Sequence, residues 1–252
     1  MAKKKPRVAT PPRVQAPQQR GASTSTGGLG IGHRNMLYAV AGGGTIALVV
    51  VVLIVALGGG KKHGTGSTPP TNTAVASAMT KAGCTYKTVN GYVPKGQNVH
   101  VPSLTAKLPW NTDPPSNGQH YPLWAVWGFY TDPVNPRQVV HNEEHGGVIL
   151  WWGPKVPQST IDGLRKLYDE QPDGVFGTPY ATLGTKVAIT AWTGDVAKYN
   201  SNVGYYGFGH IGVCPSYTPA TEKAFRTFRN AFRGKGPEGI PLSADKPGLG
   251  PQ

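Results

Sequence analysis

Residues 141–152 read HNEEHGGVILWW, and the two halves of this stretch carry different information. The second half, 148–152, is an apolar run with the length of a buried strand. The first half combines two histidines with two glutamates, and two glycines separate it from the second half. We therefore expect a strand buried in a core, with a cluster of reactive polar groups directly before it.

The pattern of apolar residues around this stretch predicts a folded domain over residues 80–242. Helical spacing predicts one helix over 157–171 and a final helix that opens at Thr218, with three phenylalanines on one face. Strands are expected at 98–102, 124–130, 148–152 and 187–192, and a loop dense in turn residues at 110–121. This order of elements predicts an α+β fold, with a small mixed sheet and two packed helices.

Residues 36–57 read MLYAVAGGGTIALVVVVLIVAL and carry no charge. A helix of this length spans roughly 33 Å, which matches a bilayer core of about 30 Å. The segment follows seven basic residues and no acidic one: Lys3, Lys4, Lys5, Arg7, Arg13, Arg20 and Arg34. This charge bias predicts a single-pass protein with a cytoplasmic N-terminus and an extracellular C-terminal domain. A cleaved signal peptide is the alternative, although its apolar region is usually only about 7–15 residues long.

Composition divides the remainder of the chain. Residues 1–35 are expected to be a disordered basic tail, 58–79 a flexible linker and 243–252 a second disordered tail. The tail contributes much of the net charge of +13, and beside a membrane helix it suits anionic lipid headgroups. It lacks interleaved aromatic residues, so we expect no nucleic-acid partner, and the sequence identifies no protein partner.

Two cysteines, Cys84 and Cys214, fall on the outer side of the predicted membrane helix, where disulfides form and persist. A bridge between them would close a loop of about 130 residues, to which the chain-entropy model assigns about 4–5 kcal/mol. The alternative is a pair of buried free thiols. The wide spacing excludes a catalytic C-x-x-C motif.

The histidines predict a site for a divalent metal ion. We expect His120, His141 and His145 to bind it, and the further candidate ligands are Glu144, His100 and His210. Imidazole groups are ligands that zinc and copper(II) accept. The alternative is that these histidines only brace the fold through hydrogen bonds.

His141 and His145 can share an ion only if the chain between them is compact. Four residues of strand span about 13 Å, whereas one helical turn brings such a pair to about 6 Å. Because Val139 and Val140 favour an extended chain and two glycines follow, we expect a turn or bulge here and no stable helix. The H-x-x-E-H metalloprotease pattern, with Glu144 as the general base, requires that helix and is not favoured.

Two motifs resemble signatures of the DUF3105 family. Residues 114–121, PPSNGQHY, are similar to its P-P-(S/T)-S-G-x-H motif, and residues 141–148, HNEEHGGV, to its H-N-x-E-H-G-G-V motif. Residues 188–192, AITAW, resemble its closing strand. The resemblance covers about residues 80–235, and it implies a bacterial, often actinobacterial, protein with one membrane helix and no assigned activity. At Glu143 the family usually carries an apolar residue, and this departure argues against burial of the position; an exposed Glu143 would most simply be a solvated charge.

Three functions are compatible with these patterns. The first is a membrane-anchored, metal-binding or metal-sensing module that is not an enzyme. The second is a structural or interaction module of the cell envelope, and the third is a metal-dependent hydrolase with Glu144 beside the ion. Convergence of three imidazole nitrogens within about 4–5 Å would favour the metal site.

Overall fold

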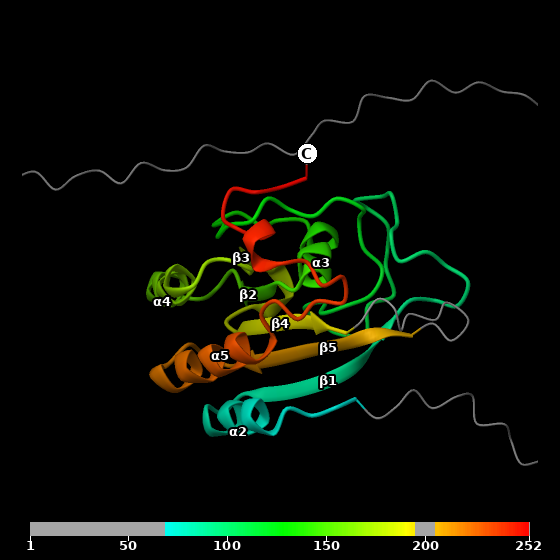
Figure 1. Ribbon diagram of the computed structural model, residues 1–252. Helices are drawn as coiled ribbons and strands as arrows, with labels where there is room; N and C mark the ends of the chain where they lie inside the picture. The colour runs from blue at the N-terminus through cyan, green and yellow to red at the C-terminus, as the bar shows by residue number, and fades with distance from the viewer. Residues whose placement is uncertain (1–68, 195–204, 252) are drawn as a thin grey trace, which may run out of the picture. The chain divides into compact units, whose positions relative to one another are not determined.

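The computed structural model describes residues 69–194 and 205–251 (Figure 1). The chain divides into two units, 1–59 and 60–252, and all of the described residues belong to the second. The predicted tail over 1–35 and membrane helix over 36–57 lie outside the described residues. Within the described ranges, no helix combines the length and the apolar character that crossing a bilayer requires.

The described residues form an α+β domain, as predicted. The helices are α2 (Thr73–Lys81), α3 (Pro136–His145), α4 (Gln158–Glu170) and α5 (Pro219–Phe232). The strands are β1 (Thr85–Tyr92), β2 (Val148–Trp152), β3 (Val175–Pro179), β4 (Val187–Thr193) and β5 (Tyr205–Cys214). Short 3-10 turns cover Ala181–Leu183 and Leu242–Ala244.

The strands form one mixed sheet in the order β1-β5-β4-β2-β3. Only β2 and β3 are parallel, and the other neighbours are antiparallel. The interior strand β2 contributes to two cores, since Val148, Leu150 and Trp152 face one side while Ile149 and Trp151 face the other. The continuous apolar run therefore reflects a strand that is buried on both faces.

Helices α2, α4 and α5 supply the core on one face of the sheet, and α3 packs on the other (Figure 1). In α5, Phe225, Phe228 and Phe232 are buried as the helical spacing predicts. Helix α3 contributes Val139 and Val140 to the opposite core, and long irregular segments complete that side. The histidine-rich stretch thus lies on the face of the sheet that loops cover.

Two expected strands are not regular strands. Residues 98–102 form only an isolated bridge, His100 to His120, and residues 124–130 form only the bridge of Phe129 to Gly177. The backbone at Trp127 instead exchanges hydrogen bonds with the C-terminal segment, donating to the Leu249 oxygen and accepting from the Gly248 nitrogen. Ala125, Trp127 and Phe129 of this segment are buried, and its backbone bonds partly to the C-terminal segment and partly to Gly177 of β3.

The boundaries of the folded domain are wider than the sequence predicts. The expected linker over 58–79 ends earlier, because α2 begins at Thr73 and its Val75 and Met79 are fully buried. The expected tail over 243–252 is packed on the domain as far as it is described, and Asp245 within it has no exposed surface.

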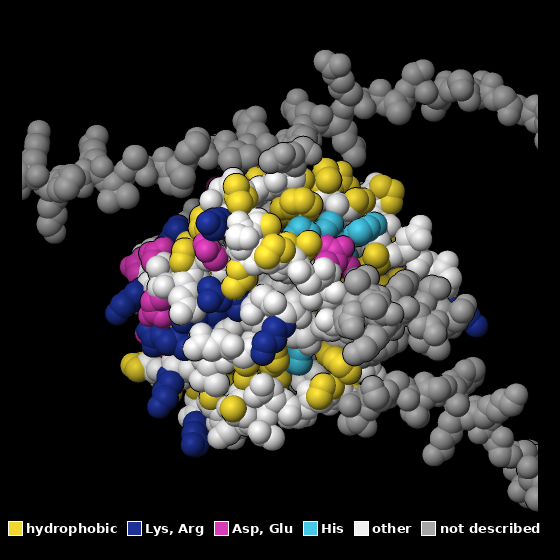
Figure 2. Space-filling model, viewed as in Figure 1, with side chains coloured by type: hydrophobic (Ala, Val, Ile, Leu, Met, Phe, Trp, Pro, Cys, Tyr) yellow, Lys and Arg dark blue, Asp and Glu magenta, His cyan; other side chains and the backbone are white. Residues whose placement is uncertain are grey.

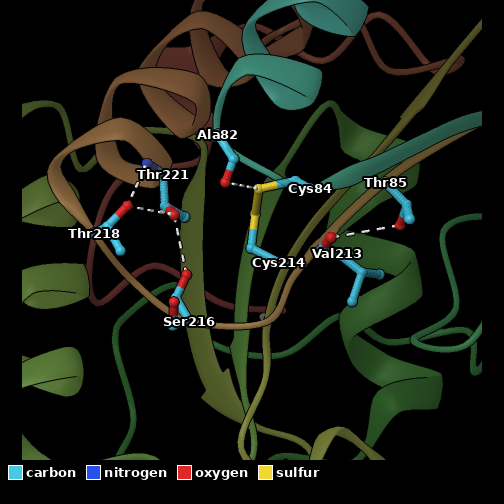
Figure 3. Close-up of a disulfide and its surroundings, with 8 residues drawn as sticks. All are labelled: Ala82, Cys84, Thr85, Val213, Cys214, Ser216, Thr218 and Thr221. Carbon is cyan, nitrogen blue, oxygen red and sulfur yellow. Dashed lines mark hydrogen bonds between the residues drawn. A yellow bond between two sulfur atoms is a disulfide. The ribbon is translucent and has the colours of Figure 1, made fainter.

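The predicted disulfide is present. Cys84 and Cys214 join the chain just before β1 to the end of β5, with a separation of 130 residues in sequence (Figure 3). Beside the bridge, Thr85 is paired with Val213 across the two strands. Just beyond it, Thr218 caps α5 by accepting a hydrogen bond from the backbone nitrogen of Thr221. The bridge therefore fixes the edge of the sheet on which α2 and α5 pack.

Candidate metal centre

The stretch 136–145 is a helix, so the expectation of an extended chain with a turn was wrong. Asn135 caps its N-terminus by accepting a hydrogen bond from the Arg137 nitrogen at 3.1 Å, and Pro136 occupies the first turn. Gly146 ends the helix in the left-handed conformation, with φ of 113°. These capping signals and the burial of the two valines outweigh the weak helix propensity of valine. In the sequence, Asn135 followed by Pro136 is the signal from which the start of this helix could have been predicted.

One helical turn brings the histidines of this stretch together. The ring centroids of His141 and His145 are 4.9 Å apart. Trp124 packs against both rings, at 5.5 Å and 4.5 Å, and Trp192 packs edge-on against His120. Aromatic side chains therefore wall the histidines on two sides and limit the access of water to them.

Four side chains form what we call the inner cluster: His100, His120, His141 and Glu144. Each offers one nitrogen or oxygen atom, and these atoms all lie within 4.8 Å of one another. The Glu144 Oε2 atom lies 2.9 Å from the Nε2 of His120, 3.4 Å from that of His100 and 3.9 Å from that of His141. Three separate segments of the chain thus converge on one point.

Backbone carbonyls set the orientation of two of these rings. The Nδ1 atom of His120 lies 2.8 Å from the Gly118 oxygen, and that of His141 lies 2.9 Å from the Tyr121 oxygen. Since a carbonyl oxygen only accepts, we assign the proton to Nδ1 in both rings. In the neutral state each Nε2 then directs a lone pair at Glu144, as in histidines that bind metal ions.

The inner cluster is buried except on one side. The side chains of His120, His141 and Glu144 are 0%, 5% and 1% exposed, whereas that of His100 is 39% exposed. Figure 2 shows histidine and acidic side chains next to one another at the surface, with hydrophobic side chains around them. Exchange with solvent would therefore take place past His100.

The charges within the cluster suit a cation. Burial by itself raises the pKa of Glu144, but the close nitrogens of His100 and His120 lower it below its ordinary value. Burial, together with the neighbouring His120, lowers the pKa of His141 to about 3. Neither oxygen of Glu144, nor the Nε2 of His100 or His120, makes a hydrogen bond of normal geometry. A neutral imidazole beside an ionised carboxylate is the state that a metal ion requires.

His145 belongs to a different group, which corrects the expectation that it joins His120. Its Nε2 lies 3.4 Å from the Oε2 of Glu238, and its Nδ1 lies 3.5 Å from the Oδ1 of Asp245. His141, His145 and Glu238 also have ligand atoms within 4.8 Å of one another. We call His145, Glu238 and Asp245 the outer cluster. Sequence reasoning missed both carboxylates, because they lie in a glycine- and proline-rich segment without periodicity.

His210 and Glu143 have structural surroundings. Within the described residues, His210 lies in neither metal-compatible group, and both of its nitrogens have partners. The hydroxyls of Tyr86 and Thr88 contact Nδ1, and that of Thr193 contacts Nε2. The ring of Phe232 stacks on the imidazole. Glu143 is fully buried, so the expected solvated charge was wrong. Burial raises its pKa well above the ordinary value, which keeps it neutral beside Thr190.

The helix that the H-x-x-E-H metalloprotease pattern requires is present, but Glu144, its proposed general base, is not separate from the candidate ligands. Glu144 is part of the inner cluster and is almost completely buried against three histidines. A general base needs a water or substrate proton within reach. The carboxylate therefore has the surroundings of a ligand.

The family comparison supports the resemblance found in the motifs. The family described as "Protein of unknown function (DUF3105)" matches residues 100–202. The match contains all four residues of the inner cluster but neither Glu238 nor Asp245 of the outer cluster. No curated protein and no solved structure matches the chain. The similarity to the DUF3105 family therefore extends over residues 100–202, which contain the inner cluster.

Proposed function

We propose that the chain binds a divalent metal ion, zinc or copper(II), through His100, His120, His141 and Glu144. One observation carries the proposal: the ligand atoms of the three histidines and of Glu144 all lie within 4.8 Å of one another. Around an ion with bonds of about 2.0–2.1 Å, tetrahedral ligand atoms lie about 3.4 Å apart. The separations from Glu144 Oε2, which run from 2.9 Å to 3.9 Å, bracket that value.

The charges of the inner cluster favour a bound metal ion over histidines that only stabilise the fold through hydrogen bonds. With a single proton, on Nδ1, His120 would point its Nε2 lone pair at a carboxylate oxygen 2.9 Å away, which is repulsive, and both groups are buried. A divalent cation between them converts that repulsion into two coordinate bonds. Four protein ligands also describe a closed site of the structural type, whereas catalytic sites keep a position for water. We therefore infer a metal-binding or sensing module and not an enzyme.

The proposed setting is a membrane surface. The uncharged segment 36–57 would cross the bilayer once, with the basic tail at anionic lipid headgroups of the cytoplasmic face. The domain would then lie outside the cell. The disulfide between Cys84 and Cys214 suits that oxidising side, and it leaves no free thiolate among the described residues to compete for the ion.

Metal content is the direct test. The full-length chain, purified in detergent without a histidine tag, is stripped with a chelator and reloaded with zinc or copper(II). Elemental analysis should find metal in the wild-type chain, and much less in the variant His120→Asn. The variant His210→Gln is the matched control, because it changes a buried histidine outside the cluster. A reloaded wild-type chain without metal would rule the proposal out.

The alternative is a structural or interaction module in which the histidines only brace the fold. The two functions differ in what a chelator does to stability. An ion that binds only the folded state, at about a hundred times its dissociation constant, adds about 2.7 kcal/mol. If the histidines are a brace, the melting temperature stays the same with and without zinc, while His120→Asn still lowers it.

A metal-dependent hydrolase remains a second candidate function because the H-x-x-E-H string lies on one helix. In that function His141 and His145 would hold the ion with Glu238, and Glu144 would act as the base. The contacts of Glu144 with His100 and His120 favour the binding function instead. Hydrolysis of a peptide or ester by the zinc-loaded chain, abolished in Glu144→Gln with zinc still bound, would reverse that preference.

A further inference from the structure

The outer cluster has the chemistry of a metal site in its own right. His145 has a carboxylate near each ring nitrogen, Asp245 at Nδ1 and Glu238 at Nε2. Its side chain is 7% exposed, Asp245 is not exposed at all, and Glu238 is 29% exposed. A neutral imidazole donates one hydrogen bond, so one of the two carboxylates must face a lone pair.

Burial decides which nitrogen carries the proton. The Asp245 carboxylate is fully enclosed, and neither of its oxygens makes a hydrogen bond of normal geometry. A buried acceptor that receives no proton is costly, so we assign the His145 proton to Nδ1, toward Asp245. A carboxylate behind a histidine is the arrangement that orients metal ligands and makes them more basic. The Nε2 lone pair then points toward Glu238.

The chain brings Glu238 to this position by a close backbone contact. The Gly234 nitrogen donates to the Gly146 oxygen at 2.8 Å, and the Glu238 nitrogen donates to the Glu144 oxygen at 3.3 Å. A Cβ atom at Gly236 would lie 2.3 Å from the Glu144 oxygen, so only glycine permits this approach. The segment is therefore seated against the C-terminal end of α3, beside the inner cluster.

His141 separates the two clusters. The Nδ1 atom of His141 bonds to the Tyr121 oxygen, so only Nε2 is left to bind a metal ion. His141 lies close to the ligand atoms of both clusters, but this one nitrogen can serve only one ion. An ion in the inner cluster takes that nitrogen. A second ion would then have His145 Nε2 and Glu238 as protein ligands, and water in its other positions.

We infer that the outer cluster binds a second divalent cation, of the kind that accepts imidazole and carboxylate, at His145 and Glu238. Asp245 is a positioning residue for His145. The inference rests on the proposed function in one respect, since it assigns His141 to the inner ion. With fewer protein ligands and a partly exposed carboxylate, the outer ion binds more weakly and exchanges with solvent more readily than the inner ion.

A zinc titration of the full-length, tag-free chain in detergent tests this inference. Elemental analysis after equilibrium dialysis at rising free zinc should give two steps in the wild-type chain, a tight one and a weaker one. Glu238→Gln should lose the weaker step and keep the tight one. Asp245→Asn should weaken the second step by about 10–100-fold, as loss of a carboxylate that orients a metal-binding histidine does. Glu170→Gln is the control, with 30% exposure against 29% for Glu238.

Each other outcome has a distinct meaning. A wild-type chain that takes up one ion in a single step overturns the second site and leaves the proposed function standing. A chain that takes up none overturns both. Retention of both steps in Glu238→Gln and in a second variant, His145→Gln, would also overturn the outer site, because the weaker ion would then be held elsewhere.

Discussion

Glu143 and Glu144 are consecutive residues of α3, both fully buried, and they face different surroundings. Glu144 meets the histidines of the inner cluster, whereas Glu143 lies beside Thr190 of β4. One is held as a carboxylate by its neighbours, and burial keeps the other protonated. The helix therefore separates two chemically identical side chains into a ligand and a neutral core residue.

The first prediction follows from this pair. Glu144→Gln should abolish tight zinc binding, because an amide cannot supply the negative charge. Glu143→Gln should keep it, and should change the free energy of unfolding by only about 1 kcal/mol, because an amide resembles the protonated carboxyl. Zinc titration and urea denaturation measure the two effects. Equal loss of zinc in both variants would mean that α3 itself is disturbed.

The second prediction concerns pH and His210. Burial lowers the pKa of His210 from 6.5 to about 4. The unfolded chain therefore binds a proton at a higher pH than the folded chain, and this histidine contributes its full stability above about pH 6.5. That contribution falls as the pH drops from about 6.5 toward 4, by on the order of 3 kcal/mol.

Urea denaturation at a series of pH values, with a chelator present, measures this dependence. His210→Gln keeps an amide near Thr193 and removes the titrating group, so its stability should vary less between pH 4 and 6.5. A variant with the same slope as the wild-type chain would show that another group causes the loss.

The third prediction concerns the disulfide. Reduction of the bridge between Cys84 and Cys214 should destabilise the domain by about 2–5 kcal/mol, because the unfolded chain regains the freedom of a long loop. Melting curves with and without reductant measure the change. The double variant Cys84→Ser plus Cys214→Ser should melt at the lower temperature under both conditions, and a response to reductant there would contradict the assignment.

The fourth prediction compares two glycines of the C-terminal segment. Gly236→Ala places a Cβ atom 2.2 Å from the Gly146 nitrogen, so the segment must move away from α3. We expect a loss of about 1–3 kcal/mol in stability, together with loss of the outer zinc step. Gly239 has a positive φ of 66°, but a Cβ atom there would meet nothing within 4 Å, so Gly239→Ala should keep both zinc steps.

Local patterns were sufficient for much of the fold. The apolar run of β2, the β-branched residues of β4 and the helical spacing of α4 and α5 each predict the observed element within a residue or two. These elements are amphipathic or wholly buried, so the pattern of their own residues reports the surroundings. The disulfide was predictable for a different reason, since only two cysteines are available to pair.

The remaining elements depend on contacts between distant segments. Trp127 looks like part of a strand, but its backbone is paired with the C-terminal segment. Val139 and Val140 favour a strand locally, but caps at both ends and burial make them helical. Glu238 reaches the histidines through a glycine contact with α3. The partners of Trp127 and Glu238 could not be identified from the neighbouring residues in the sequence, whereas the caps of α3 adjoin that helix.

The C-terminal segment has a practical consequence for protein production. Trimming the chain at residue 242, where the aromatic-rich composition ends, would delete Asp245 and the hydrogen bonds that Gly248 and Leu249 make with Trp127. Cloning only the family-matched span would also discard β1, both cysteines of the disulfide and α5. An expression plasmid should encode residues from before Asn72 through to 251, with any purification handle placed upstream.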